Sequence, residues 1–253
     1  MMNALEYLKK QELYWINIWD VEWRRIHMMS EVAPMFYYNR RVPAITADKI
    51  SGFETQRFVD DWRAYWDEHK DELHYVNQPP GVQFREATQR ANIAIRKSHM
   101  RALSFGCSHT PGGGRFLVAE DDIYPRSTLL AGEVPGPPES ADVAIWSGGL
   151  PMAGVSHDDH IFLKGEQHFW MKVADSYKHN CLGAGLYEIK NSDVAEHIIS
   201  GVRRTPMSYD HAWGVPFRDL EVWRLVPSAF AQAGPSIRNT KVREPVLDRG
   251  VST

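Results

Sequence analysis

The chain has 253 residues, of which 24 % are charged and 43 % hydrophobic, and 29 basic against 32 acidic residues give a formal net charge of −3. At roughly 150 residues per domain, this length predicts one large domain or two small ones. The composition excludes disordered, collagen-like and coiled-coil chains. The near-neutral charge argues against a protein that coats nucleic acid through charge alone, although it leaves room for local contacts.

Several features bear on the compartment. No apolar run approaches the ~20 residues of a membrane span. Residues 1–6 lack the charged and apolar regions of a signal peptide. The two cysteines, Cys107 and Cys181, are too few for a disulfide framework and fit a reducing environment. We therefore expect a cytoplasmic protein without a membrane span.

The first 45 residues predict a β-α-β unit. An apolar strand is expected over 13–18, and Asp20 is a candidate N-cap for a helix over 21–29 that Pro34 ends. A second strand is expected over 41–45. Strand, helix and strand in this order favour an α/β fold with a nucleotide-sized crevice at the strand ends.

Two helices are expected next. The first, over 53–75, carries aromatic residues at spacings of three and four, and packing on the core is the preferred interpretation over a ligand platform (Phe58, Trp62, Tyr65, Trp66). The second is expected over 86–105, followed by a flexible, glycine-rich connection over 107–114. That connection is a weak candidate for a phosphate-binding loop, because no Lys-Ser/Thr follows it.

An acidic triplet provides the strongest signal in the chain. A buried strand over 115–119 stops at Glu120, Asp121 and Asp122. Adjacent carboxylates repel one another, so such a group persists either when a cation compensates it or when all three side chains point into water. Strand alternation would place Glu120 and Asp122 on one side and Asp121 on the other. Carboxylates are hard ligands that suit Mg²⁺ or Mn²⁺, while a solvated acidic turn is the alternative.

The second half holds further polar clusters. His157 and His160 have the spacing of zinc ligands, but no glutamate lies between them and a polar loop is preferred. A strand over 182–189 begins with small residues, and Ser192-Asp193 is expected to cap a helix over 194–201. Asp210 and His211 then place an acid and an imidazole on a loop.

The order of these landmarks resembles the family 25 glycosyltransferases, which include lipooligosaccharide and collagen galactosyltransferases. The resemblance covers residues 13–240 and rests on short motifs: Ile16-Asn17, Arg24-Arg25, residues 41–45, Lys97-Ser98-His99, residues 117–122, Asp142-Val143, residues 183–187, residues 206–210, Gln232 and Ser236-Ile237. Three features depart from the family pattern. Residues 94–97 replace an expected Gly-Cys, residues 107–109 offer a second Ser-His alignment, and residues 157–160 have no counterpart.

This resemblance implies a single GT-A domain over residues 1–240, with a Rossmann-like, mostly parallel central sheet flanked by helices and a loosely attached tail over 241–253. It implies transfer of a sugar from a nucleoside-diphosphate sugar, most often a UDP-sugar, to an acceptor hydroxyl with inversion. It further implies Mn²⁺ or Mg²⁺, which stabilises the charge of the departing diphosphate as a Lewis acid.

The resemblance also suggests roles for individual residues. Asp122 and His211 would hold the metal, Glu120 would bind the ribose or the donor sugar with support from Asp121, and Asp210 would be the catalytic base. Further residues would line the donor site (Asn17, Arg24, Arg25, Ala44, Ser98, His99, Gly183). Asp122→Ala is expected to abolish transfer while leaving the fold intact, because an exposed carboxylate contributes little stability.

The acceptor stays open between two classes at this point. A glycan such as a lipopolysaccharide is one, and a hydroxylated base in DNA is the other, with the base swung out onto an aromatic ring. Basic residues over 238–243 would contact phosphates or form a solvated terminus. Two alternatives to a glycosyltransferase are a metal-dependent phosphoesterase or nuclease that uses the acidic triplet with His157 and His160, and a non-catalytic module whose tryptophans stack on sugars or bases.

Overall fold

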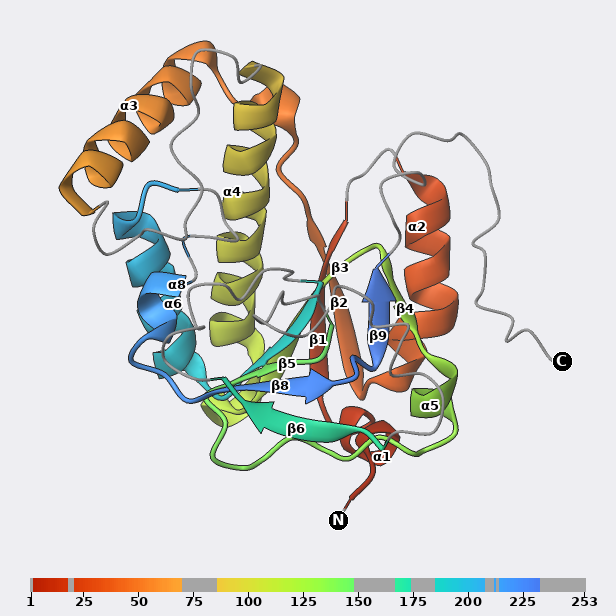
Figure 1. Ribbon diagram of the computed structural model, residues 1–253. Helices are drawn as coiled ribbons and strands as arrows, with labels where there is room; N and C mark the ends of the chain where they lie inside the picture. The colour runs from red at the N-terminus through yellow and green to blue at the C-terminus, as the bar shows by residue number, and fades with distance from the viewer. Residues whose placement is uncertain are drawn as a thin grey trace, which may run out of the picture.

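A computed structural model describes residues 2–17, 21–69, 86–147, 167–173, 185–207, 212 and 214–232. Its centre is a seven-stranded sheet in the order β2-β1-β3-β7-β5-β8-β6 (Figure 1). The strands of this sheet are β1 (Glu12–Asn17), β2 (Tyr38–Pro43), β3 (Phe116–Glu120), β5 (Val143–Ile145), β6 (Phe169–Lys172), β7 (Leu186–Ile189) and β8 (Val222–Val226). A separate antiparallel pair joins β4 (Ile123–Pro125) to β9 (Phe230–Gln232).

The sheet is mixed but runs mainly in one direction. Strand β1 pairs in parallel with β2 and β3, and β5 pairs in parallel with β8. Strand β7 is antiparallel to both β3 and β5, and β6 is antiparallel to β8. Five of the seven strands therefore point the same way, which confirms the expected α/β class with a mostly parallel central sheet.

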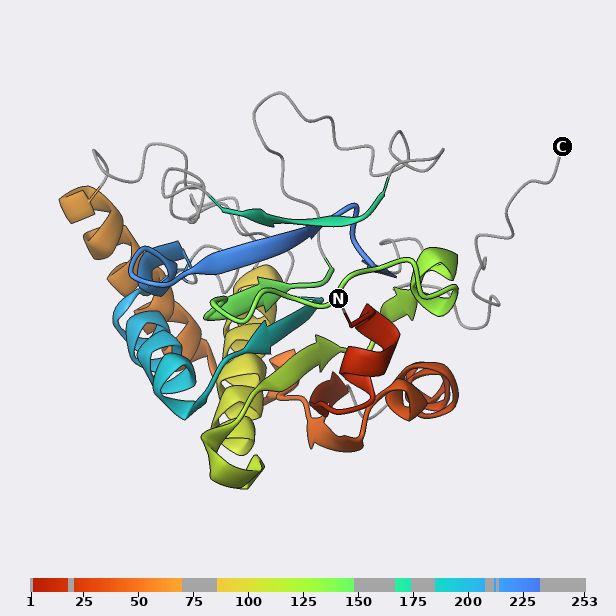
Figure 2. The ribbon, with the colours of Figure 1, turned by 90° about the horizontal axis from the view of Figure 1, so that it is seen from below.

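Helices cover both faces of this sheet (Figure 2). One face carries α4 (Glu86–His109) and α6 (Ser192–Arg204), with α3 (Gly52–His69) and α8 (Gly214–Phe217) packed beside them. The other face carries α1 (Ala4–Leu8), α5 (Ser127–Leu130) and α2 (Glu22–His27), which continues through the π-turn η1 (Met28–Val32) and the 3₁₀ turn η2 (Ala33–Met35). Two short 3₁₀ turns, η3 (Ala47–Lys49) and η4 (Pro111–Gly113), complete the described elements.

Strand alternation sorts the core into two clusters. Tyr14, Phe116 and Val118 face α4 and α6, whereas Trp15 and Leu117 face α1, η1 and α5. Because helices cover both faces, side chains on both sides of the central strands are buried. This arrangement is that of a single Rossmann-like domain.

Most of the elements expected from the sequence are present, with shifted ends. Helix α4 continues to His109, so residues 107–109 are helical and do not form the flexible connection we expected; Ser108 Oγ donates to the Ser104 carbonyl one turn back (2.9 Å). Helix α6 is capped by Asn191, whose side chain accepts from the Val194 amide, and not by Ser192-Asp193. The expected cap Asp20 and the tail beyond residue 241 lie outside the described residues.

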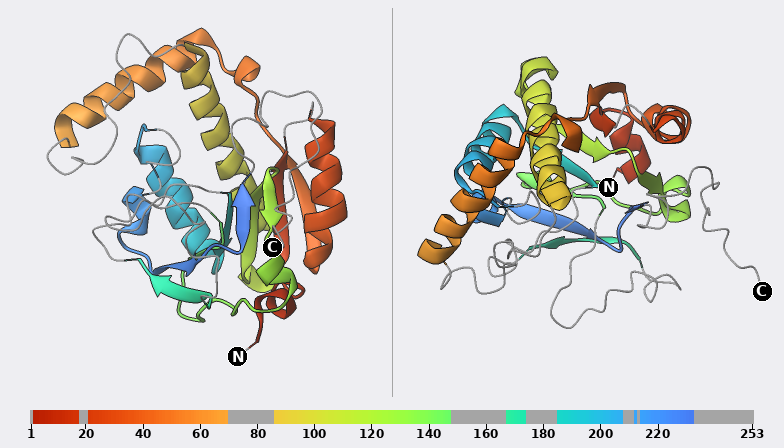
Figure 3. Two further views of the ribbon diagram at one scale, coloured as in Figure 1. Left: turned by 45° about the vertical axis from the view of Figure 1, so that its right-hand side comes forward. Right: turned by 90° about the horizontal axis from the view of Figure 1, so that it is seen from above.

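The aromatic stripe of α3 packs on the core as preferred from the sequence. Trp62 is buried, and Phe58, Tyr65 and Trp66 are partly buried against the same cluster. Trp15 and Trp146 are also buried, so these tryptophans are packing residues and not stacking surfaces. Figure 3 shows α3 and the start of α4 rising beyond the sheet.

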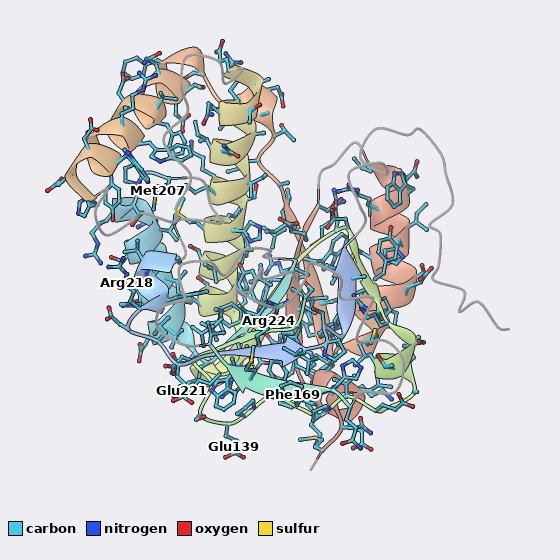
Figure 4. All side chains as sticks on the ribbon, viewed as in Figure 1. Glu139, Phe169, Met207, Arg218, Glu221 and Arg224 are labelled. Carbon is cyan, nitrogen blue, oxygen red and sulfur yellow. The ribbon has the colours of Figure 1, made fainter. Side chains whose placement is uncertain are left out.

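Long-range side-chain contacts fix α4 against its neighbours. The buried Arg96 guanidinium of α4 donates to the carbonyls of Val202, Thr205 (2.6 Å) and Met207 (3.0 Å) at the end of α6. Met207 is labelled in Figure 4. No helix in the described part of the chain combines the length and apolar character needed to cross a bilayer.

Close packing of α4 on β3 gives a direct test of the fold. A Cβ at Gly106 would lie 2.1 Å from Cε2 and 2.4 Å from Cδ2 of the fully buried Phe116. We expect Gly106→Ala to lower the free energy of unfolding by about 1–3 kcal/mol, because overpacking forces these elements apart. Chemical denaturation measures this change.

Gly52→Ala is the matched control, because its new Cβ would meet nothing closer than 3.5 Å. This variant should be unchanged or up to about 1 kcal/mol more stable. Equal stability of the two variants would contradict the packing of α4 on β3.

Candidate functional site

The candidate site lies at the point where the order of successive strands in the sheet changes direction. From β1 the chain moves outward to β2, and β3 then returns to the opposite side of β1. The carboxyl ends of β1 and β3 therefore flank the switch point, which is where open α/β sheets bind ligands. Asn17 ends β1 and Glu120 ends β3, so the structure brings two separate sequence motifs to one edge.

A buried ion pair joins α2 to the end of β3. Arg24 Nη1 lies 2.9 Å from Asp121 Oδ1, and Asn17 Nδ2 donates to Asp121 Oδ2 at 2.5 Å. All three residues are buried. Alternation explains the meeting, because Asn17 and Asp121 continue the face of β1 and β3 that carries α2. These contacts bring Asn17, Arg24 and Asp121 into one group, and their expected role in binding a sugar donor stays a prediction.

Asp122 contacts the same guanidinium more loosely. Its Oδ2 lies 3.8 Å from Arg24 Nη1, and only 2 % of the residue is exposed, against 4 % for Asp121. The alternative of a solvated acidic turn is therefore wrong, as is the expectation that Asp122 is an exposed carboxylate. A cation does compensate the acids: Arg24 forms the ion pair with Asp121 and lies near Asp122, and Arg41 also interacts electrostatically with Asp121.

Glu120 belongs to the other face of the sheet. Its Oε1 lies 3.2 Å from Nε2 of His99 on α4, and His99 Nδ1 lies 3.1 Å from the Tyr187 hydroxyl. A neutral imidazole satisfies both contacts when Nε2–H donates to Glu120 and Nδ1 accepts the tyrosine proton. The expected pairing of Glu120 with Asp122 is wrong, because β3 ends at Glu120 and the turn that follows directs Asp122 to Arg24.

Ser98 and His99 lie beneath the site. Only 1 % of His99 is exposed, and Ser98 Oγ accepts from the Ile45 amide (2.8 Å) while donating to the Ala94 carbonyl (2.7 Å). The Ala44 amide in turn donates to the Asn17 carbonyl at 3.0 Å. These contacts hold the end of β2 beside β1. Direct contacts of Ser98, His99 and Ala44 with a bound nucleotide sugar stay predictions.

Two residues at this edge were not among the site residues predicted from the sequence. Burial lowers the pKa of Arg41, the charge of Arg25 lowers it further, and Asp121 opposes both effects, so Arg41 faces the same site from β2. Burial raises the pKa of Tyr124 to about 12; Arg24 opposes this shift, and Asp122 adds to it. Side-chain alternation along β2 could have predicted that Arg41 faces this site. No local sequence pattern predicts the same for Tyr124.

Several buried polar atoms at the site have no hydrogen-bond partner among the described residues. They include Asn17 Oδ1, an acceptor, Arg24 Nε, a donor, and the hydroxyl of Tyr124. A buried polar group without a partner costs about 1–3 kcal/mol, so such groups call for an explanation. An unpaired donor beside an unpaired acceptor suits a polar ligand that carries both functions.

A divalent cation fits the chemistry of this donor set. Within the described parts of the chain, no group of three or more His, Cys, Asp or Glu side chains is arranged to hold a metal ion. Mg²⁺ and Mn²⁺ need only one or two protein carboxylates when substrate phosphates supply other ligands. Asp122 and the amide oxygen of Asn17 are hard oxygen donors of this kind.

Several expected site residues lie outside the described residues. They are Gly183, Asp210, His211 and the group from His157 to His160. Gly185, which is described, accepts a hydrogen bond from the Glu120 amide at 2.9 Å. Gly185, which directly precedes β7, therefore lies at this edge.

Comparisons with known proteins do not identify the chain. No protein-family model matches it, and no curated protein matches it. The resemblance to family 25 glycosyltransferases thus stays a prediction that rests on motif order.

Adjacent arginines on α2 provide a matched pair of variants. Arg24→Ala would leave Asp121 buried without its cation, and we expect a loss of about 3–5 kcal/mol in the free energy of unfolding. Arg25 pairs with the exposed Glu22 at 3.4 Å, and Arg25→Ala should cost less than about 1 kcal/mol. Urea denaturation at neutral pH compares the two.

Asp121→Asn, alone and combined with Arg24→Ala, completes a double-mutant cycle that measures the coupling energy between Arg24 and Asp121. In an Arg24→Ala background Asp121 is already a buried carboxylate without its guanidinium partner, so replacing it by asparagine removes an unpaired charge and should cost much less than the same substitution does alone. Simple additivity of the two losses would show that Arg24 and Asp121 are not coupled.

Proposed function

We propose that the protein is a metal-dependent glycosyltransferase that binds a nucleoside-diphosphate sugar, most often a UDP-sugar, at the carboxyl ends of β1 and β3. The observation that carries this proposal is the buried edge itself, where Arg24 Nε and Asn17 Oδ1 have no partners among the described residues. A nucleotide sugar offers both kinds of complement: anionic phosphate oxygens for the arginine, and ribose or base donors for the amide oxygen.

Arg24 is the central residue of the donor site in this proposal. Its Nη1 holds Asp121, which leaves Nε to face the diphosphate. Arg25 and Arg41 add positive charge beside it. The charge of the leaving diphosphate grows as the glycosidic bond breaks, and fixed cations stabilise it without reorganising at that moment.

The acidic residues divide the remaining tasks. Asp122 would hold Mn²⁺ or Mg²⁺ together with the diphosphate, and His211 is the second proposed ligand. A bound divalent cation supplies Lewis-acid stabilisation of the leaving group. Glu120, oriented by His99, would accept hydrogen bonds from the ribose or the donor sugar. Asp121 positions Arg24 and Asn17.

Inversion at the anomeric carbon requires a base on the face opposite the leaving group. Asp210 is the proposed base that takes the proton from the acceptor hydroxyl. The acceptor is either a glycan, such as a lipopolysaccharide, or a hydroxylated base in DNA. In either case the base acts on the acceptor alone, so its loss should not weaken binding of the donor.

Thermal unfolding with a panel of nucleotide sugars, with and without Mn²⁺, tests the donor site. The true donor should stabilise the wild type by about 2.7 kcal/mol at a hundredfold excess over its dissociation constant. Asp122→Asn should lose the Mn²⁺-dependent part of this gain and all transfer activity. The amide replaces the carboxylate at nearly equal volume, so the buried site stays filled.

Two further variants complete this test. Asp60→Asn removes an exposed carboxylate from α3 and should behave as wild type. Asp210→Asn should keep donor binding and lose transfer. Full transfer by Asp122→Asn, or by the wild type in excess chelator, would contradict the proposed function.

A further inference from the structure

A basic and aromatic cluster lies along the edge of the sheet and takes no part in the donor site. It comprises Tyr38 and Arg40 of β2 with Arg101, Phe105 and His109 of α4, and we call it the β2–α4 cluster. The Arg40 guanidinium carbon lies 4.9 Å from the centre of the Phe105 ring, and that ring stacks on His109 with centres 5.3 Å apart. Arg101 Nη1 donates to the Pro43 carbonyl at 3.2 Å.

Tyr38, Arg101 and His109 of the cluster are exposed, whereas Arg40 and Phe105 are half-buried. Tyr38 is 44 % exposed, and the preceding Tyr37 is 77 % exposed. Among the described residues, no carboxylate lies within ion-pair distance of Arg40 or Arg101; their contacts are a ring and a carbonyl. Other surface arginines of the same face do have acidic partners (Arg57 with Asp61, Arg63 with Asp60, Arg90 with Glu86).

Arginines that lack acidic partners and lie beside aromatic rings are suited to a nucleic acid. Arginine pairs with phosphate through its fork of donors, while tyrosine, phenylalanine and histidine rings stack on bases. A neutral glycan could stack on the rings, but it has no negative charge to pair with the two arginines. Helix α3 has the opposite character, since five acidic and two basic residues give it a net charge of −3. Phosphates are therefore repelled from α3 and attracted to β2.

The cluster is also continuous with the candidate site. Pro43, which accepts from Arg101, ends β2, and the next amide, that of Ala44, donates to Asn17. Arg41, the neighbour of Arg40 in β2, faces the donor site from the other side of the strand. A strand bound along β2 would thus reach the switch point at its carboxyl end.

We infer that the β2–α4 cluster is the docking surface for a nucleic-acid strand. The further statement that this strand carries the acceptor hydroxyl rests on the proposed glycosyltransferase function. Docking itself does not, because it needs neither donor nor metal.

Fluorescence anisotropy with a short fluorescein-labelled DNA, single-stranded and duplex, tests this inference. Arg40→Gln/Arg101→Gln should bind roughly tenfold more weakly, and the slope of log K against log salt should fall by about 2, which is one unit per phosphate contact. Arg57→Gln/Arg63→Gln removes equal charge from α3 and should change neither quantity. Glutamine keeps most of the stem length, and thermal unfolding verifies that both variants are folded.

Arg101→Gln alone provides a second route to the answer. Arg101 is exposed, so this variant should fold normally, and its salt slope should fall by about 1. The inference is overturned if the wild type does not bind DNA, if the two double variants weaken binding equally, or if vesicles that contain a lipid A phosphate displace DNA from the cluster. That last outcome would assign the surface to a phosphorylated glycolipid.

Asp122→Asn separates this inference from the proposed function. It should bind DNA as the wild type does, whether or not the wild type transfers a sugar. DNA binding at the cluster without any nucleotide-sugar binding would support docking and contradict the transferase. Binding of a nucleotide sugar without binding of DNA would support the transferase and contradict docking.

Discussion

The buried ion pair between Arg24 and Asp121 is the constraint on which the candidate site depends. Two carboxylates at the end of a buried strand cannot remain charged in a protein interior without compensation. Arg24 supplies the compensation from α2, and Asn17 supplies a hydrogen bond from β1. Together they hold a helix, two strand ends and an acidic turn in one arrangement at the switch point of the sheet.

That arrangement divides the acidic triplet between two environments. Glu120 turns toward α4 and is oriented by His99, whereas Asp121 and Asp122 turn toward α2. The division matters for chemistry because the two sides offer different functions: one carboxylate with an imidazole behind it, and two carboxylates sharing a guanidinium. Arg24 Nε and Asn17 Oδ1, which have no hydrogen-bond partner among the described residues, lie on the second side, and this is the side at which we propose that the diphosphate binds.

Charge is distributed unevenly around this edge. Helix α3 is acidic on one side, while Arg25, Arg40, Arg41 and Arg101 gather near β2 on the other. A chain with a net charge of only −3 can therefore direct an anionic partner by local charge alone. The same edge strand would separate the two proposed anion-binding tasks, since alternation directs Arg41 to the proposed donor site and Arg40 to the β2–α4 cluster.

The sequence by itself determined the local elements and the edge at which their polar ends meet. The strand expected over 13–18, which the structure has at Glu12–Asn17, the helix that follows it and the acidic triplet were all readable, because periodicity and strand-end polarity are local properties. Only the tertiary structure decided that Asp121 and Asp122 are buried, that Arg24 and not Arg25 compensates them, and that Arg41 and Tyr124 face the site. Arg24 and Asp121 are 97 residues apart, and which side chains meet over such a distance follows from the packing of whole elements, which no local pattern encodes.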